Sequence, residues 1–378
     1  MLKFSSPRST AALAFGAFAL AVLPASAAPD PKAVADALVA AIGATDRAAV
    51  SYDGATASGE TITIANYKVS QVDGDNVTIP SLVLEGVEAR PEGGFTAESM
   101  IFDNGSGTRG KDKVAWATGR IEGALIPTPE EIRAKADLRP LSHLSMSNLT
   151  VTKSGLETPL TVAGVEVAVQ PAADGTPGSF SSEVKGIHVS TEMLSDRPQE
   201  KAILDALGYQ QLDINVASAG SFDAASKTMI LDQMSINATD VGTLIVKGKF
   251  SGISAGEVAT ARNTPEMRSE AKIDNLEVRF ENGGVVERAL DMHAALTFGT
   301  REDAAKQVKA ALPLFISLIG NDAFGAKLSK AVGDFLSDPQ TITVSATPAA
   351  PVSMQDIFKT LRKPGALPDL LAVDVTAN

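Results

Sequence analysis

The run TITIANYKV, Thr61–Val69, alternates between apolar and polar residues and decides the fold class. A second run of the same kind, NVTIPSLVLE, follows at Asn76–Glu85 after a short cluster of Asp and Gly residues. Successive side chains of a strand point to opposite faces of a sheet, so period-two runs separated by turn residues are typical of antiparallel hairpins. Both runs therefore predict strands of an antiparallel sheet.

The same pattern recurs along most of the chain, each time bounded by Gly, Asp or Asn. We therefore expect a mainly β fold with peripheral helices, in which residues 51–299 build a large, curved, groove-forming antiparallel sheet. The further predicted strands are Phe95–Phe102, Val114–Ile126, His143–Lys153, Leu160–Gln170, Phe180–Val189, Gln211–Ser218, Thr228–Ala238, Gly242–Ser251, Glu270–Phe280 and Val286–Thr297.

Short helices are predicted where a capping residue precedes an apolar run of period 3.6. Asp30 and Pro31 begin a docking helix that ends at Gly43, so residues 28–50 are expected to form this helix and a linker. Thr128, with Pro129 and Glu131, forms a capping-box start for a helix to about Leu138. Another helix is expected from Asp196 to Gly208.

Residues 300–378 are predicted to form a helical segment with closing strands, within the same folded unit. A helix starts at Thr300, Pro313 is expected to bend or break it, and Asn321 starts a second helix. A strand at Thr341–Ala346, a short helix at Ser353–Leu361 and a closing strand at Leu371–Thr376 complete the chain.

The first 27 residues have the pattern of a secretory signal peptide. Lys3 and Arg8 supply the positive charge, an apolar run follows at Ala11–Leu23, and Ala25 and Ala27 fit a cleavage site. The apolar run is shorter than the roughly 20 residues that span a bilayer, so we expect a mature chain without a transmembrane segment. The sequence contains no Cys, which excludes disulfides and thiolate chemistry. The chain is expected to be periplasmic.

Composition limits the classes of partner. Without its two signal-peptide charges, the chain has 31 basic and 45 acidic residues, a net charge of −14. That overall charge disfavours nucleic acid and anionic membrane surfaces as partners. One Trp, three Tyr and 14 Phe leave the core mainly to aliphatic residues. This favours long aliphatic sheet faces over an aromatic-lined pocket.

The stretch NGSGTRGKDK, Asn104–Lys113, is close to a phosphate-binding loop. Asp112 stands where that loop needs a hydroxyl for Mg²⁺, and the residues after it alternate as a strand and not as a helix. We interpret Asn104–Asp112 as a polar loop that joins two hairpin arms, Glu98–Asp103 and Lys113–Gly119. Nucleotide binding is not expected.

Catalytic and metal-binding motifs are weak throughout. His143, His188 and His293 all fall in alternating runs and form no H-x-x-x-H or H-x-H pair, so surface positions on a sheet are favoured over a zinc site. No Ser, His and acidic set stands in a recognisable order. Asp73 and Asp75 fit a turn better than a calcium loop. We therefore predict no enzyme activity, no cofactor and no metal.

A collective apolar surface remains. If alternate strand residues point to one side, the concave face of the curved sheet is aliphatic and can hold an acyl chain, unless the helices around Leu312–Leu336 fill it. The only Trp is expected on a sheet face near the Asn104–Asp112 loop. The predicted lining residues are Ile214, Val216, Leu231, Leu244, Val246, Val278 and Trp116.

Four segments carry a resemblance to known proteins. They are Leu207–Tyr209, TLIVKGKFSGI at Thr243–Ile253, NLEVRFENGGVVERAL at Asn275–Leu290, and DPQTITVSATPAAPV at Asp338–Val352. They resemble uncharacterised periplasmic β-rich proteins of alphaproteobacteria over roughly Leu194–Asn378. The strand pattern is more remotely similar to AsmA-like envelope proteins, whose long curved sheets carry an apolar groove for lipid. The resemblance includes no catalytic motif and assigns no site residue.

These observations support three functional hypotheses. The first is a non-enzymatic periplasmic protein that binds a lipid or another amphiphile, or supports maintenance of the cell envelope. The second is a structural or interaction module that contacts an envelope protein through exposed strand edges. The third, an unrecognised hydrolase, has the least support.

Overall fold

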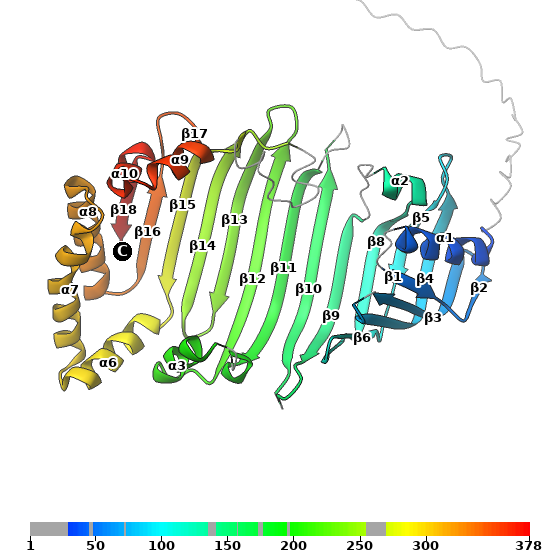
Figure 1. Ribbon diagram of the computed structural model, residues 1–378, viewed down its shortest axis with the longest axis horizontal. Coiled ribbons are helices and arrows are strands. Elements are labelled where there is room, and N and C mark those ends of the chain that lie inside the picture. Colours follow the sequence, from blue (N-terminus) through cyan, green and yellow to red (C-terminus); the bar gives the residue numbers. More distant parts are fainter. Residues whose placement is uncertain are drawn as a thin grey trace, which may run out of the picture.

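The computed structural model describes residues 29–44, 48–71, 73–134, 141–156, 158–172, 177–194, 197–254 and 270–378. In these residues the chain forms an 18-stranded antiparallel sheet, with the strands side by side along an elongated molecule (Figure 1). The predicted mainly β class with a large antiparallel sheet and peripheral helices is confirmed. The predicted signal peptide, residues 1–27, and the predicted helix end near Leu138 lie outside the described residues.

Most strands pair with their neighbours in the sequence. β3 to β5 are consecutive, β5 pairs with β8, and β8 to β16 then follow in chain order without a crossover. The strands are β1 (Ala48–Ser51), β2 (Gly54–Ser58), β3 (Thr61–Gln71), β4 (Asn76–Ala89), β5 (Phe95–Ile101), β6 (Ser106–Arg109), β7 (Asp112–Ala115), β8 (Thr118–Ile126), β9 (His143–Thr152), β10 (Leu160–Pro171), β11 (Pro177–Ser190), β12 (Gln211–Asp223), β13 (Thr228–Ala238), β14 (Gly242–Ser251), β15 (Lys272–Asn282), β16 (Thr341–Ala346), β17 (Val352–Ser353) and β18 (Val373–Ala377).

The helices lie at the ends and margins of this sheet (Figure 1). They are α1 (Pro31–Gly43), α2 (Pro129–Arg133), η1 (Thr191–Leu194), α3 (Pro198–Ala206), α6 (Val285–Thr297), α7 (Arg301–Ser317), α8 (Asp322–Ser337), α9 (Met354–Thr360), η2 (Pro364–Ala366) and α10 (Leu367–Leu370).

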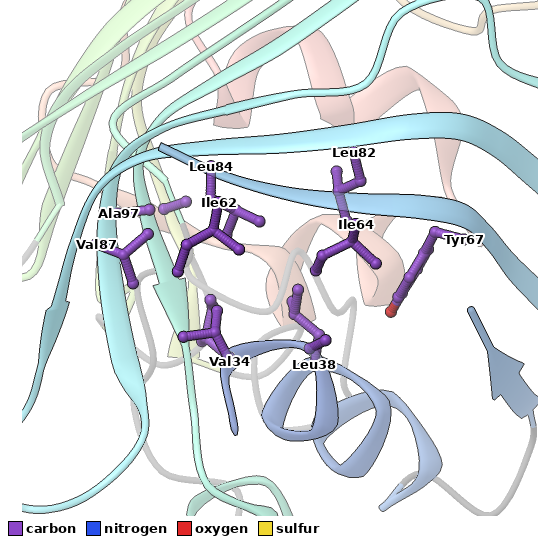
Figure 2. Close-up of a cluster of buried hydrophobic side chains, with 12 residues drawn as sticks. Val34, Leu38, Ile62, Ile64, Tyr67, Leu82, Leu84, Val87 and Ala97 are labelled. Atoms are coloured by element: carbon purple, nitrogen blue, oxygen red, sulfur yellow. The ribbon is translucent and has the colours of Figure 1, made fainter. Parts of the chain in front are cut away.

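The first helix closes the N-terminal end of the sheet. Asp30 caps α1 by accepting a hydrogen bond from the Lys32 amide. Figure 2 shows Val34 and Leu38 pointing from α1 into a cluster of side chains from β3 and β4, among them Ile62. Ile62 is fully buried in this cluster. This is the largest two-layered core in the described part of the chain.

The last helices close the C-terminal end. Phe335 of α8 meets Phe280 of β15 edge to face, with ring centroids 6.3 Å apart, and Val375 of β18 is buried. Thr300 and Asp303 form the capping box that starts α7, and Leu290 and Ala294 of α6 are buried against that helix. The middle of the sheet lies between these two covered ends.

Single residues in the left-handed conformation reset the alternation within several strands. Ile64 and Tyr67 are three residues apart, yet both point into the α1 core, because Asn66 between them has a φ of 49°. Leu84 and Val87 reach the same core because Gly86 has a φ of 60°. Without such a residue the second side chain of each pair would point to the opposite face. The residues of this kind inside β3, β4, β8, β9 and β11 are Asn66, Gly86, Gly123, Asn148 and Gly186.

Two sequence-based predictions are wrong. The predicted strand Val286–Thr297 is helix α6, because its apolar residues Leu290 and Ala294 recur at four-residue spacing and pack on α7. Asn104–Asp112 is not one polar loop but contains β6, which turns at Gly110 into β7. The arm that pairs with β5 is therefore β8. Of the two alternatives expected for Pro313, a bend or a break of its helix, the break is excluded because α7 continues to Ser317.

The two-layered end and the open middle should respond differently to the same substitution. Leu82, which is 2% exposed, lies in the α1 core, whereas Leu244 on β14 is 37% exposed. We expect Leu82→Ala to lower the free energy of unfolding by about 2–5 kcal/mol and Leu244→Ala by less than about 1.5 kcal/mol. Urea unfolding measures both. Equal losses would mean that the middle of the sheet is also covered.

Tyr67 gives a second prediction. Burial raises the pKa of Tyr67 to about 12, and its hydroxyl has no hydrogen-bond partner among the described residues. Tyr67→Phe should keep or raise the stability, by up to about 1 kcal/mol, because it removes an unsatisfied buried group. The folded state favours the neutral phenol, so the advantage of the variant should grow between pH 10 and pH 12. Denaturation of both proteins across that range tests this, and a destabilised variant would contradict it.

Candidate functional site

The side chains of one sheet face form a ladder that crosses thirteen strands from β3 to β18. Each member lies directly opposite the next in the register of the paired strands, and two serines are the only polar members. In order they are Ile62, Leu84, Met100, Ile121, Leu144, Val167, Ser182, Ser218, Met234, Val246, Val278, Val344 and Val375. We call the face that carries this ladder the apolar face.

The next residue along each strand belongs to the opposite face, and its ladder is polar. Register joins these side chains from β8 to β18, with only one alanine and one isoleucine among them. In order they are Arg120, Ser145, Glu166, Glu183, Ala217, Ser235, Ile245, Arg279, Thr343 and Thr376. This polar face needs no covering layer, whereas the apolar face is built to leave water.

The six strand residues predicted to line a groove all lie on the apolar face. Val246 faces Val278, and Leu244 shares its face with Ile236, which in turn is opposite Val216. Leu231 faces Gly248. The positions on the apolar face are Ile214 and Val216 on β12, Leu231 on β13, Leu244 and Val246 on β14, and Val278 on β15.

Between β9 and β15 no helix of the described residues covers the apolar face (Figure 1). The helices α1 and α8 cover its two ends, and Figure 1 shows no described helix across β9 to β14. Met234 and Leu244 are each 37% exposed, and the Leu, Val and Met side chains around them are only half-buried. The helices around Leu312–Leu336 thus leave this section uncovered. We call it the open section.

Two serines interrupt the open section. The Ser182 and Ser218 hydroxyls lie opposite each other on β11 and β12 and share a hydrogen bond of 2.8 Å. Because each hydroxyl has the other as a partner, the pair exposes less polarity than two separate serines would. These serines, and also Leu144, Val167 and Met234, were not predicted to line the groove. The apolar residues on either side of Asn148 are three positions apart, and so are those on either side of Gly186. This spacing would have predicted which side chains of β9 and β11 lie on the apolar face.

Trp116 lies at the N-terminal border of the open section. Its indole N–H donates to the Phe102 carbonyl at 2.7 Å, and the two rings meet edge to face at 6.2 Å. Phe102 packs against the α1 core, and the Trp116 ring fills the space that a Cβ at Gly105 would need. The tryptophan is therefore half-buried and close to the predicted hairpin, but separate from the six central residues.

A hollow of about 310 Å³ lies against the polar face, lined by His143, Glu166, Ala168, Ser181, Glu183 and Ala217 of that face, together with Ser182 and Ser218 of the apolar ladder. Glu166 and Glu183 are directly opposite in register, and Lys185 forms an ion pair with Glu183 at 3.0 Å. His143 lies 3.8 Å from Glu122. Across the described ranges, no hydrogen bond joins a serine to His143. The pair of nucleophile and general base that a serine hydrolase needs is therefore not assembled at this histidine.

The other histidines have ordinary partners. His188 on β11 contacts Asp213 on β12, and His293 lies on α6 beside Gln307 of α7, not in a strand as predicted. In the part of the chain that the structure describes, no three His, Asp or Glu residues are grouped as metal ligands. The three histidines are thus far apart in the fold.

The loop with a phosphate-binding pattern has other hydrogen-bond partners. The Gly110 amide donates to Asp75 at 2.8 Å, and Asp112 accepts from the Ser154 amide at 2.9 Å. Asp73 in turn accepts from the Asp75 amide, as expected for a turn. These hydrogen bonds connect β6 and β7 to neighbouring segments. They also occupy the Gly110 amide, a donor that a bound phosphate would need.

Part of the chain matches a protein family. A family model described as an uncharacterized protein matches residues 235–378, from the end of β13 to the C-terminus. No curated protein matched the chain. The matched region contains the last strands of the open section and the whole C-terminal helical end. Among the helices of the described residues, none is long and apolar enough to cross a membrane.

Proposed function

We propose that this protein is a non-enzymatic periplasmic protein that binds a long-chain amphiphile, such as a fatty acid or a phospholipid, on the open section of the apolar face. The observation that carries the proposal is the contrast between the two ladders. One is almost wholly apolar, although partly exposed in the open section, and the other is polar, although they differ by one residue along each strand. A role in maintaining the cell envelope would follow from such binding.

The physical drive is the removal of apolar surface from water. An exposed apolar patch larger than a few hundred Å² is unusual on a soluble monomer and marks a binding surface. Each methylene that moves from water onto the face contributes about 0.8 kcal/mol. An acyl chain supplies many methylenes and has no polar group that the face would leave unpaired.

The dimensions of the open section suit an acyl chain. Seven strands from β9 to β15, at a spacing of about 4.8 Å, make the section about 29 Å wide. The hydrocarbon core of a bilayer, which contains two layers of acyl chains, is about 30 Å thick. One membrane-lipid chain would therefore fit across the section. The lining is aliphatic and not aromatic, which favours a flexible chain over a flat ring or a sugar.

Native mass spectrometry and lipid extraction of the purified mature chain test this directly. We expect a co-purifying fatty acid or phospholipid, or measurable binding of oleate to the delipidated protein. Protein that is reproducibly empty and does not bind oleate or phosphatidylglycerol would refute the proposal.

Paired variants on one strand locate the ligand. Val246→Glu puts a charge into the apolar ladder, whereas Ile245→Glu puts the same charge on the polar face, opposite Arg279. We expect Val246→Glu to weaken oleate binding at least about tenfold, since a carboxylate would have to be buried against the chain. Ile245→Glu should bind as the wild type does. Circular dichroism verifies that both variants fold, and equal binding by both would exclude the apolar face.

Trp116 offers an optical measurement of the same event. Because this tryptophan lies at the border of the open section, a brominated acyl chain bound there should quench its fluorescence in the wild type and in Ile245→Glu. The quenching should be lost in Val246→Glu. Quenching that persists in Val246→Glu would place the acyl chain elsewhere.

A further inference from the structure

Large apolar side chains gather where α7 ends. Leu314, Phe315 and Leu318 are 70%, 64% and 76% exposed. Ile316 in the same turn points inward, because its Cγ2 lies 2.8 Å from where a Cβ at Gly325 of α8 would be. The last turn of α7 therefore has one packed side and one bare apolar side.

A second segment brings further apolar residues to this end of the molecule. The Asn321 side chain donates to the Gly365 carbonyl at 2.8 Å, and Gly365 packs so closely on Gly320 that a Cβ would be 2.3 Å from the Gly320 carbonyl oxygen. Phe358 and Leu361, just before this contact, are 50% and 51% exposed. Figure 1 shows α9 and α10 at the same end as the junction of α7 and α8. We call Leu314, Phe315, Leu318, Phe358 and Leu361 the helical tip.

The helical tip carries basic side chains in an acidic protein. Lys359, Arg362 and Lys363 are exposed, and no acidic residue stands between Asp356 and Asp369. Among the described residues, neither Arg362 nor Lys363 forms an ion pair, while Lys359 lies 3.5 Å from Asp356. The chain as a whole has a net charge of −12. The tip is thus a local basic and apolar surface.

We infer that the helical tip docks on the surface of an anionic lipid bilayer. Its apolar side chains enter the boundary between headgroups and acyl chains, and its three basic side chains lie at the level of the lipid phosphates. This is the combination by which interfacial helices bind membranes. The negative charge of the remaining protein is repelled by the same surface, and this repulsion, although screened by salt, orients the molecule with the tip toward the bilayer.

A second copy of the chain fits the tip less well. A two-fold interface would bring the same patch of both subunits together and place Arg362 and Lys363 against their equivalents. Like charges in contact oppose such an interface. An anionic bilayer complements both the apolar and the basic residues, and so the charges favour it as the occupant.

Vesicle flotation of the purified chain tests the inference. We expect binding to vesicles of phosphatidylcholine with phosphatidylglycerol, and weaker binding to phosphatidylcholine alone. The triple variant Leu314→Glu, Phe315→Glu, Leu318→Glu should reduce partitioning at least about tenfold, because apolar burial is lost and negative charge is added. Changing Lys359, Arg362 and Lys363 to Gln should reduce it by about fivefold per charge on the anionic vesicles.

Two controls separate this site from others. Leu296→Glu with Phe298→Glu alters exposed apolar residues at the C-terminal end of α6, just before α7 begins, and should leave flotation unchanged. Val246→Glu, which disables the proposed acyl-binding face, should also float normally, so docking is separable from ligand binding. The inference would be overturned if the wild type did not float with the vesicles, or if either control lost flotation as much as the triple variant does. It would also be overturned if light scattering showed a dimer that the triple variant disperses, without any vesicle binding.

Discussion

The structure depends on the cross-strand register that keeps the same kind of side chain on one face of the sheet. A slip of one residue in a single strand would exchange its apolar and polar residues between faces. Left-handed residues such as Asn66 and Gly186 are part of this constraint, because they shift the phase within a strand where the sequence itself shifts. Each of these residues interrupts the alternation in the sequence, and it thereby keeps the apolar side chains on the same face of the sheet.

A sheet held in this way is stable without a complete second layer. The backbone hydrogen bonds of each inner strand are satisfied by two neighbours, and side chains along each ladder pack laterally on one another. The ends are different, because a terminal strand has one neighbour only. Helices α1 and α8 lie at these ends, and there the apolar face is buried. Burial is thus concentrated toward the two ends of the sheet, and exposure in its middle.

Local sequence patterns predicted much of this architecture. Thr228–Ala238, Gly242–Ser251 and Thr341–Ala346 match their strands, and Asn321 does start α8, because alternation and capping are local signals. Val286–Thr297 was misassigned because it begins with the second of two valines that follow a Gly pair, which favours a strand, although the later residues carry a helical period. The pairing of β5 with β8 depends on how the intervening strands β6 and β7 pair with each other, and no local sequence pattern encodes this. The common face of the six central residues followed from alternation, but its exposure depends on where the C-terminal helices pack.

The chain-order arrangement of the central strands has an evolutionary consequence. From β10 to β14 each strand pairs, among the described residues, only with its two sequence neighbours, so the middle of the molecule behaves as a one-dimensional array. Duplication or loss of one hairpin would lengthen or shorten the sheet by about 10 Å and leave both capped ends intact. Gene rearrangement could therefore adjust the span of the surface in two-strand steps without the invention of a new fold.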